Sequence, residues 1–495
     1  MLPLTLRGIH KHFGAVHAVR GVDFTLGPGE VHALLGENGA GKSTLMHIAF
    51  GLVRADRGDV VVDGVARALR SPREARRLGV GMVHQHFTSV PALSVAENIA
   101  LAAGWSPKTR LLAKRVDGVF RRVGLALDPD APAWTLPVAL KQRLEIVKAL
   151  ATDVRILLLD EPTAVLAPAE ADELLRVVRR FTEQGGTAVL ITHKLREALA
   201  TADTVTVLRR GQVTFSGPTA EIDADSVLRY MIGGRLPESR PAPPAAAPGA
   251  VRIQAEALDV ARDGRGGTAL RQATFSVRAG EIVGIAAVEG NGQRELMRAA
   301  AGLLPPLRGR LDVTGPVGFV PEDRTTEGLI PEFSLTENLV LGLDRVAPWV
   351  RGRRFRRIDW NAAREGAADI LRNFEVDAPG PGVPAASLSG GNQQRLVIAR
   401  ALEQEPTVLV AENPTRGLDI RAAQAVEARL RAAAHEGAAV LVYSSDLDEI
   451  LQIANRVLVV AGGTVTEVPP HARREEVGAM MLNVHAERAD PSGSR

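Results

Sequence analysis

Residues 36–44 combine closely spaced glycines with a lysine and two hydroxyl side chains. In order they are Gly36, Glu37, Asn38, Gly39, Ala40, Gly41, Lys42, Ser43 and Thr44. This order matches the GxxxxGK[ST] pattern of loops that bind phosphate groups. Glycines let backbone N–H groups curl around an anion, Lys42 can reach the β- and γ-phosphates, and the Ser43 hydroxyl can bind Mg²⁺. The run therefore predicts a nucleotide site.

Two carboxylates and a histidine follow apolar runs further along the chain. Asp160 and Glu161 end the run 156–159, and His193 comes shortly after the run 188–191. Beside a phosphate loop, Asp160 can hold Mg²⁺ through water and Glu161 can polarise the attacking water. A strand-end histidine is by itself more often structural than catalytic, but beside such a site His193 can contact the γ-phosphate. The three residues are candidates for the chemistry of hydrolysis.

Strands and helices must position these side chains. Residues 31–35 form a predicted buried strand before the glycine loop, and apolar residues recur at helical spacing after it. A further strand runs into a polar loop at Gln85, and a helical stretch is expected from Val95 to about Leu127. Because strands and helices alternate through the first half, we expect an α/β fold with a largely parallel sheet.

Composition limits the remaining possibilities. The chain has 495 residues, 45% of them hydrophobic and 24% charged, as in an ordinary soluble protein of two or three domains. The net charge of +3 gives no strong case for nucleic-acid binding. No cysteine is present, which excludes disulfides, thiolate metal sites and cysteine nucleophiles. We expect a cytosolic protein, because the N-terminus lacks a secretory signal and no run is long enough to span a membrane.

The chain repeats itself after a spacer rich in proline and alanine at 237–249. Gly39 and Gly41 recur 251 residues later as Gly290 and Gly292, and the offset stays near 252 through most of a domain. A constant offset over this length predicts a tandem duplication. The expected organisation is a first domain at 1–236, the linker at 237–249, a second domain at 250–484 and a disordered tail at 485–495.

These motifs resemble those of the ATP-binding cassette (ABC) ATPases. Residues 388–395, with the sequence LSGGNQQR, match the signature loop of that family. Gln85 stands at its Q-loop, Asp419 in its D-loop, His193 at its switch histidine, and Phe13 where an aromatic ring stacks on adenine. The resemblance implies two tandem P-loop domains, each with a mixed, largely parallel sheet, a helical subdomain and an antiparallel β subdomain. It is most similar to the tandem ATPase subunit of bacterial importers for simple sugars and nucleosides.

Each half lacks what the other retains. In the second half, the positions of Gly36, Lys42, Ser43, Gln85, Asp160, Glu161 and His193 carry Ala287, Gln293, Arg294, Glu322, Glu412, Asn413 and Ser445. An amide cannot serve as a general base, and a loop without lysine holds triphosphate poorly. In the first half, the signature loop is replaced by Leu136, Pro137, Val138, Ala139 and Leu140. Proline removes a backbone donor there, and the larger side chains displace phosphate contacts.

The family resemblance implies that such domains close head-to-tail, each pairing its phosphate loop with the partner's signature loop. The intact parts then fall in one site and the damaged parts in the other, so we expect one hydrolysable ATP per chain. Mg²⁺ would be held near Ser43, Gln85 and Asp160. The signature loop would contribute Ser389, Gly390, Gly391 and Asn392, with Asp419 close by.

The resemblance also implies partners. We expect separate transmembrane permease subunits, an extracytoplasmic solute-binding protein acting indirectly, a peripheral position on the cytoplasmic face of the membrane, and no nucleic acid. The residues beside Gln85, which are His84, His86 and Phe87, resemble the nucleoside branch of this family more than the ribose branch, so we expect a nucleoside as the solute. Two alternatives stay open: a soluble tandem ABC ATPase acting on ribosomes or nucleic acid, and a regulatory protein in which nucleotide binding only changes shape.

Head-to-tail closure makes a specific prediction about two variants. Ser389→Arg would place a bulky side chain where the γ-phosphate must lie, and should abolish ATP hydrolysis by the folded, permease-bound chain. Leu140→Arg would alter only the damaged signature and should cost much less. Steady-state phosphate release, normalised to complex, measures both. The opposite ranking would show that each phosphate loop works with the signature of its own domain.

Overall fold

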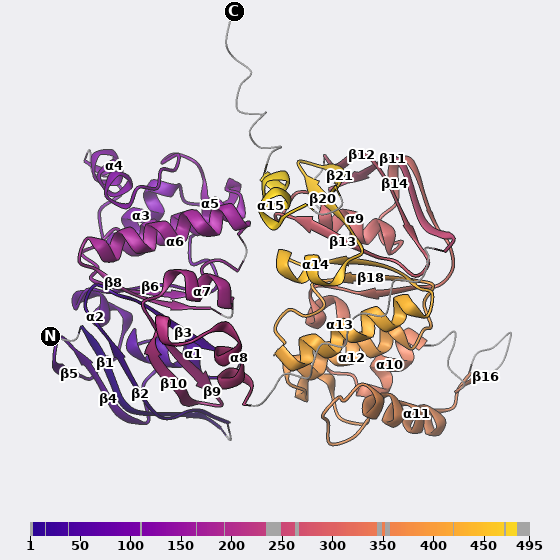
Figure 1. Ribbon diagram of the computed structural model, residues 1–495, viewed down its shortest axis with the longest axis horizontal. Helices are drawn as coiled ribbons and strands as arrows, with labels where there is room; N and C mark the ends of the chain where they lie inside the picture. The colour runs from indigo at the N-terminus through magenta and orange to yellow at the C-terminus, as the bar shows by residue number, and fades with distance from the viewer. Residues whose placement is uncertain are drawn as a thin grey trace, which may run out of the picture. The chain divides into compact units, whose positions relative to one another are not determined.

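The computed structural model describes residues 3–14, 16–37, 39–108, 111–164, 166–192, 194–233, 249–262, 267–343, 349–351, 357–418, 420–469 and 472–482. The chain divides into two compact units, Met1–Glu238 and Ser239–Arg495 (Figure 1). The predicted tail lies outside the described residues, and so does the predicted linker apart from Gly249.

The first unit is built on a six-stranded sheet of order β10-β9-β3-β8-β7-β6. These strands are β3 (Val31–Gly36), β6 (Val80–Val83), β7 (Ile156–Asp160), β8 (Thr187–Ile191), β9 (Thr204–Arg209) and β10 (Gln212–Pro218). All neighbours pair in parallel except β10, which pairs antiparallel with β9. Buried on both faces, the central strands are almost continuously apolar, as parallel strands must be.

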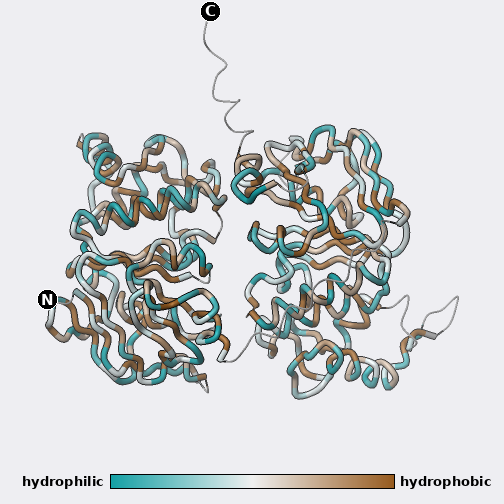
Figure 2. Tube along the Cα trace, viewed as in Figure 1, coloured by the Kyte–Doolittle hydropathy of each residue, from teal (hydrophilic) through white to brown (hydrophobic). Residues whose placement is uncertain are grey.

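A second, antiparallel sheet of order β2-β1-β4-β5 belongs to the same unit. Its strands are β1 (Leu4–Phe13), β2 (Val16–Leu26), β4 (Arg57–Val62) and β5 (Val65–Arg67). Helix α1 (Lys42–Ala49) supplies Leu45, Met46 and Ile48 to a core cluster that also contains Leu6 of β1 and Leu158 of β7. This shared core fixes the helix after the glycine loop between the two sheets, and Figure 2 shows hydrophobic residues gathered along the strands.

Eight helices surround these sheets in the described part of the first unit. They are α1, α2 (Pro72–Arg77), α3 (Val95–Ala103), α4 (Leu112–Val123), α5 (Val138–Leu150), α6 (Pro168–Glu183), α7 (Leu195–Thr201) and α8 (Ala224–Ile232). Helices α3, α4 and α5 pack on one another as a helical part of the unit (Figure 1). The helical stretch expected from Val95 to about Leu127 consists of two helices, α3 and α4, because α3 ends at Gly104, which takes the left-handed conformation at φ 69°.

The second unit repeats this architecture. Its six-stranded sheet has the order β15-β18-β19-β13-β20-β21, with strands Val317–Val320, Val408–Glu412, Ala439–Tyr443, Ile282–Ala287, Arg456–Ala461 and Thr464–Glu467. The antiparallel sheet β12-β11-β14 comprises Thr268–Arg278, Val251–Ala261 and Pro306–Val313, and a small ribbon joins β16 (Val350–Arg351) to β17 (Arg357–Ile358). When this order is read in reverse, from β21 to β15, each strand takes the place of its counterpart in the first unit, read from β10 to β6.

The helices of the second unit also correspond to those of the first. They are α9 (Gln293–Ala300), α10 (Leu335–Leu343), α11 (Trp360–Asn373), α12 (Gly390–Leu402), α13 (Ile420–His435), α14 (Leu447–Ile453) and α15 (Arg474–Leu482). A π-helical turn, Arg324–Gly328, is specific to this unit within the part of the chain described. The predicted fold class, with two mixed, largely parallel sheets and antiparallel sheets beside them, is confirmed. Across the described ranges, no helix is both long and apolar enough to cross a membrane.

Candidate nucleotide site

The glycine loop connects the end of β3 to the start of α1. Gly41 precedes the helix with φ 102°, and a Cβ atom there would lie 2.3 Å from the carbonyl oxygen of Ala18. Only glycine tolerates both the left-handed conformation and this close approach. The first N–H groups of α1 have no partner within the helix, so the loop and the helix start present donors to an anion.

Lys42 begins α1 and is only 6% exposed. Its Nζ donates to the carbonyl oxygens of Gly36 at 2.7 Å and Glu37 at 3.0 Å. Burial lowers the pKa of Lys42, while the charges of Glu161, Asp160 and Glu37 act in the opposite direction. The lysine is therefore held at the base of the loop as a desolvated cation, where a phosphate anion would stabilise its charge.

Asp160 and Ser43 meet across the sheet although 117 residues separate them. The Ser43 hydroxyl donates to Asp160 Oδ1 at 3.2 Å, and Asp160 is almost fully buried. Burial raises the pKa of Asp160, the hydrogen bond from Ser43 lowers it, and the neighbouring Glu161 raises it further. A hydroxyl and a buried carboxylate are ligands that suit Mg²⁺ when phosphate oxygens and water complete the shell.

Glu161 lies next to this pair in a left-handed backbone conformation, with φ 48°. Its N–H donates to the carbonyl oxygen of Ile191 at 3.0 Å, which ties it to the neighbouring strand β8. Gln85, from the loop after β6, donates from Nε2 to Glu161 Oε2 at 3.1 Å. The structure thus brings together Lys42, Ser43, Asp160, Glu161 and Gln85, all from the predicted set.

The remaining predicted residues are Phe13, Asn38, His193 and Asp419. Phe13, at the end of β1, is 50% exposed, and Lys11 Nζ lies 5.3 Å from its ring centroid. An exposed ring at a sheet edge can stack on a base. Asn38, His193 and Asp419 lie outside the described residues.

The predicted signature residues form the start of α12 in the second unit. The Ser389 side chain accepts from the Asn392 N–H at 3.4 Å, and Asn392 exchanges two further bonds with the backbone of Asp377, both at 3.1 Å. Gly390 lies so close to Arg324 that a Cβ atom would be 2.5 Å from its guanidinium. Sequence reasoning did not single out Arg324, because nothing in its local pattern marks its approach to a helix 66 residues later in the chain.

The second unit retains the backbone of the loop but not its side chains. Gly292 has φ 106°, close to the value at Gly41. Gln293 Oε1 accepts from the Asn291 N–H at 3.1 Å, and Asn291 Nδ2 donates to the carbonyl oxygen of Val288 at 3.0 Å. Arg294 pairs with Glu327 at 2.7 Å. In place of the lysine and the serine, this loop has side-chain bonds within itself and to Glu327.

The catalytic carboxylate position of the second unit is likewise occupied by an internal network. Asn413 keeps the left-handed backbone of Glu161, at φ 43°. Its Nδ2 donates to Glu322 Oε1 at 3.0 Å, and its Oδ1 accepts from the Ser445 N–H at 2.7 Å. Arg416 forms an ion pair with Glu322. The residues lost in the second half are thus replaced by mutually bonded ones.

The first unit defines the protein as a nucleotide-binding one of the P-loop class, with a phosphate loop, a buried aspartate and an adjoining glutamate on one parallel sheet. A family model described as "ABC transporter" matches residues 19–164 and 270–416. The chain belongs to the ABC transporter family and is an ATPase of that family. The two matched segments also confirm the tandem duplication.

Full-length relatives share this organisation. The chain is 39% identical to the nucleoside import ATP-binding protein NupA of Lactococcus lactis subsp. cremoris, over 96% of this chain and 97% of that protein. It is 40% identical to the ribose import ATP-binding protein RbsA 1 of Rubrobacter xylanophilus, over 96% of each. The glucose import ATP-binding protein TsgD13 of Haloferax volcanii is 37% identical, over 97% of this chain and 95% of that protein.

Among solved structures, the complex of the archaeal ribosomal stalk protein aP1 with the ribosome recycling factor aABCE1 contains a similar fold. The TM-score is 0.67 at 19% identity, over 96% of this chain and 92% of the other. At this identity the likeness shows the fold alone. It does not favour the ribosomal alternative.

Glu412, the counterpart of Asp160, provides a test of the second unit's electrostatics. It is 2% exposed, its Oε2 accepts from the Glu322 N–H at 3.2 Å, and its Oε1 has no hydrogen-bond partner. Burial raises the pKa of Glu412 from 4.5 to about 7. Because the folded state disfavours the charged form, the stability contributed by Glu412 is present below pH 4.5 and is lost as the pH rises through 7.

We therefore expect Glu412→Gln, which cannot ionise, to gain stability relative to the parent as the pH rises. Between pH 5 and pH 8 the difference in unfolding free energy should shift by about 2 kcal/mol in favour of the variant. Urea unfolding of the full chain, with hydrogen exchange followed in β18, measures this shift. Asp323→Asn is a control, because hydrogen bonds hold the pKa of that carboxyl below its usual range. A difference that does not change with pH would contradict the elevated pKa.

Proposed function

We propose that the chain is the ATP-hydrolysing subunit of an importer that takes up a nucleoside or a simple sugar through a separate permease. The observation that carries this proposal is the set formed by Lys42, Ser43, Asp160, Glu161 and Gln85 in a chain similar over nearly its whole length to import ATP-binding proteins. The relatives named for nucleoside, ribose and glucose import differ in solute, so the class of solute is a small polar molecule. The permease would place this subunit on the cytoplasmic face of the membrane, with a solute-binding protein on the other side.

In this function the phosphates of ATP bind to Lys42 and to the N–H groups at the start of α1. Ser43 and Asp160 would hold Mg²⁺, which supplies charge neutralisation of the phosphate oxygens. Glu161 orients the attacking water and accepts its proton, and Gln85 holds the Glu161 carboxylate in place. His193 and Asp419 complete the set by their match to the family motifs.

We further propose that Ser389, Gly390, Gly391 and Asn392 contact the γ-phosphate bound in the first unit. Support comes from the complementary losses: the first unit lacks a signature, and the second has an intact one beside an internally bonded loop. N–H groups at the start of α12 would form charge-assisted hydrogen bonds worth about 1.5–3 kcal/mol each.

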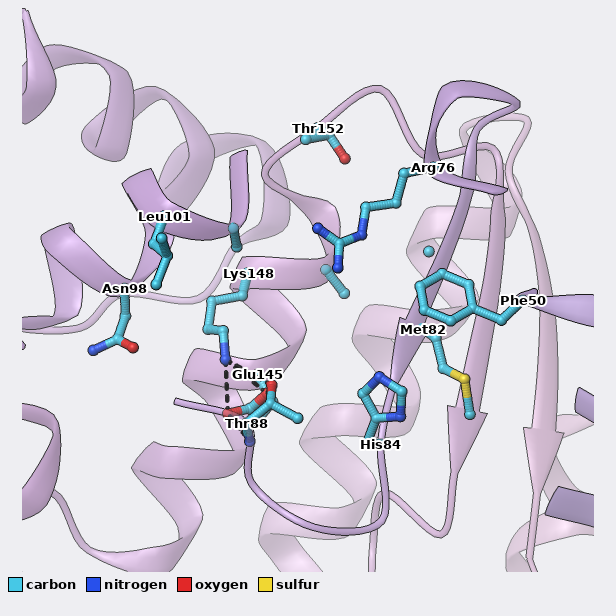
Figure 3. A pocket seen from close by; sticks show the side chains of 13 residues that line it. Phe50, Arg76, Met82, His84, Thr88, Asn98, Leu101, Glu145, Lys148 and Thr152 are labelled. Carbon is cyan, nitrogen blue, oxygen red and sulfur yellow. Dashed lines mark hydrogen bonds and ion pairs between the residues drawn. The ribbon is translucent and has the colours of Figure 1, made fainter. Parts of the chain in front are cut away.

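A cavity of about 250 Å³ in the first unit fits a role in coupling to the permease. It opens between Phe50 at the end of α1 and Met82 of β6 on one side, and Leu101 of α3 and Lys148 of α5 on the other (Figure 3). Thr88, from the segment that follows Gln85, lines the same cavity. We propose that a helical cytoplasmic segment of the permease occupies it, with apolar side chains against Phe50 and Leu101.

Glu161→Gln tests this function in the complete transporter. The variant should keep ATP binding but lose hydrolysis by a factor on the order of 10²–10⁴, since it lacks the base, and solute uptake by proteoliposomes should stop. Asn413→Ala, at the equivalent position of the second unit, is the matched control and should retain most of both activities. Normal phosphate release by Glu161→Gln would refute the assigned role, and hydrolysis without any membrane partner co-purifying would refute the importer.

A further inference from the structure

Glu145 in α5 is a buried carboxylate that the hydrolytic set does not include. It is 4% exposed and accepts from the N–H groups of Thr88 at 3.0 Å and Ser89 at 2.9 Å. The Thr88 hydroxyl donates to its second oxygen at 2.7 Å, and the Ser89 hydroxyl donates to the first. Both carboxylate oxygens are thus occupied by two successive residues of the loop that follows Gln85.

Lys148, one helical turn further along α5, balances the charge of Glu145. Its Nζ lies 2.9 Å and 3.0 Å from the two carboxylate oxygens, and it also donates to the Thr88 hydroxyl at 2.9 Å (Figure 3). Burial raises the pKa of Glu145, but Lys148 and the hydroxyl donors outweigh that effect and leave the pKa below its usual value. The Glu145 carboxylate, which anchors the loop to α5, is therefore charged and has hydrogen-bond partners on both oxygens. Charged acceptors form stronger hydrogen bonds than neutral ones.

The anchored residues lie three and four positions after Gln85. Gln85 Nε2 contacts Glu161 at 3.1 Å, so one short segment is fixed to the hydrolytic carboxylate at one end and to α5 at the other. Only His86 and Phe87 separate Gln85 from Thr88. A shift of Thr88 is therefore passed to Gln85 through two residues.

The second unit anchors the equivalent loop in another way. At the positions of Glu145 and Lys148, α12 carries Val397 and Arg400. The loop there carries an acceptor of its own, because Asp323 Oδ1 accepts from the N–H groups of Thr325 at 2.9 Å and Thr326 at 3.2 Å. Arg400 donates to the carbonyl oxygen of Gly328, the reverse of the polarity in the first unit.

The two loops also differ in length. Val90 and Ile330 each bond through their N–H group to a buried asparagine, Asn98 or Asn338, at 2.7 Å and 2.8 Å. The first loop reaches this point five positions after Gln85, whereas the second reaches it eight positions after Glu322 and uses the π-helical turn. The first unit, which keeps the hydrolytic carboxylates, thus has the shorter loop, and Glu145 of α5 holds that loop.

We propose that Glu145 is a positioning residue for ATP hydrolysis: it fixes Thr88 and Ser89 to α5 so that Gln85 stays on Glu161. This inference rests on the proposed roles of Gln85 and Glu161. Glu145 touches no substrate atom in this scheme and acts only through the loop. Its loss should therefore lower kcat and leave the KM for ATP, which Lys42 and the loop amides determine, nearly unchanged.

A double-mutant cycle tests the proposal on the permease-bound full chain with Mg²⁺ and ATP. Glu145→Gln keeps the size of the side chain but loses its charge and one acceptor, and we expect kcat to fall about tenfold, with the KM within about twofold of the parent. Gln85→Ala should lower kcat at least as much. Because both act through one contact, the double variant should be no slower than Gln85→Ala alone. A double variant whose loss equals the product of the two single losses would overturn the proposal.

Two further variants separate positioning from folding. Glu145→Val combined with Lys148→Met imitates the apolar residue of α12 and removes the buried charge pair, a replacement that proteins often tolerate. This variant should unfold at a urea concentration close to that of the parent and still show the loss in kcat. Glu173→Gln, which removes the ion-pair partner of Arg143 on the same helix, is the matched control and should leave kcat unchanged.

The outcomes distinguish this proposal from the function on which it rests. Full hydrolysis by Glu161→Gln would refute the proposed function. Loss of hydrolysis in Glu161→Gln, together with normal kcat in the Glu145 variants, would refute the positioning role alone. A raised KM with unchanged kcat in Glu145→Gln would also refute it, because the residue would then act on nucleotide binding.

Discussion

The parallel pairing of β3, β8 and β7 is the constraint on which the site depends. Parallel strands carry their carboxyl ends to the same edge, so the loop after Gly36 and the carboxylates after Leu159 meet there although more than a hundred residues separate them. The hydrogen bond from Ser43 to Asp160 is the direct result. Gly41 is equally constrained, because the carbonyl oxygen of Ala18 leaves no room for a Cβ atom where the chain turns into α1. The antiparallel sheet thus helps to set the shape of a loop that belongs to the parallel one.

The two units share the backbone conformation of the site but differ in the side chains that it carries. Both have the same strand order, a left-handed glycine before the first helix, and a left-handed residue after the carboxylate strand, Glu161 or Asn413. The second unit keeps this strained geometry without the groups that would use it. Its Glu322, Asn413 and Arg416 bond to one another instead. A buried polar site that loses its ligand chemistry still has to satisfy its donors and acceptors, which explains why the replacements form a network.

The loop after Gln85 connects the hydrolytic carboxylate to the cavity proposed for the permease segment. In the first unit α5 holds this loop through the buried charge of Glu145, whereas in the second α12 binds the loop through a donor, Arg400, and the loop carries its own acceptor, Asp323. A loop whose acceptor lies on a neighbouring helix follows that helix when it moves. The first arrangement suits a unit in which a partner must influence Glu161.

The sequence by itself determined the fold class, the duplication and the family, because these depend on local patterns: apolar runs, glycine spacing and a constant offset between halves. It also identified Lys42, Ser43, Asp160, Glu161 and Gln85 as a group, since each belongs to a short motif. It did not place the break in the helical stretch from Val95 to about Leu127, where Gly104 ends α3. Only the tertiary structure revealed the buried Glu145 anchor, the approach of Arg324 to Gly390, and the raised pKa of Glu412. Burial and bonding between distant segments decide these features, and no local pattern of residues encodes which segments will meet.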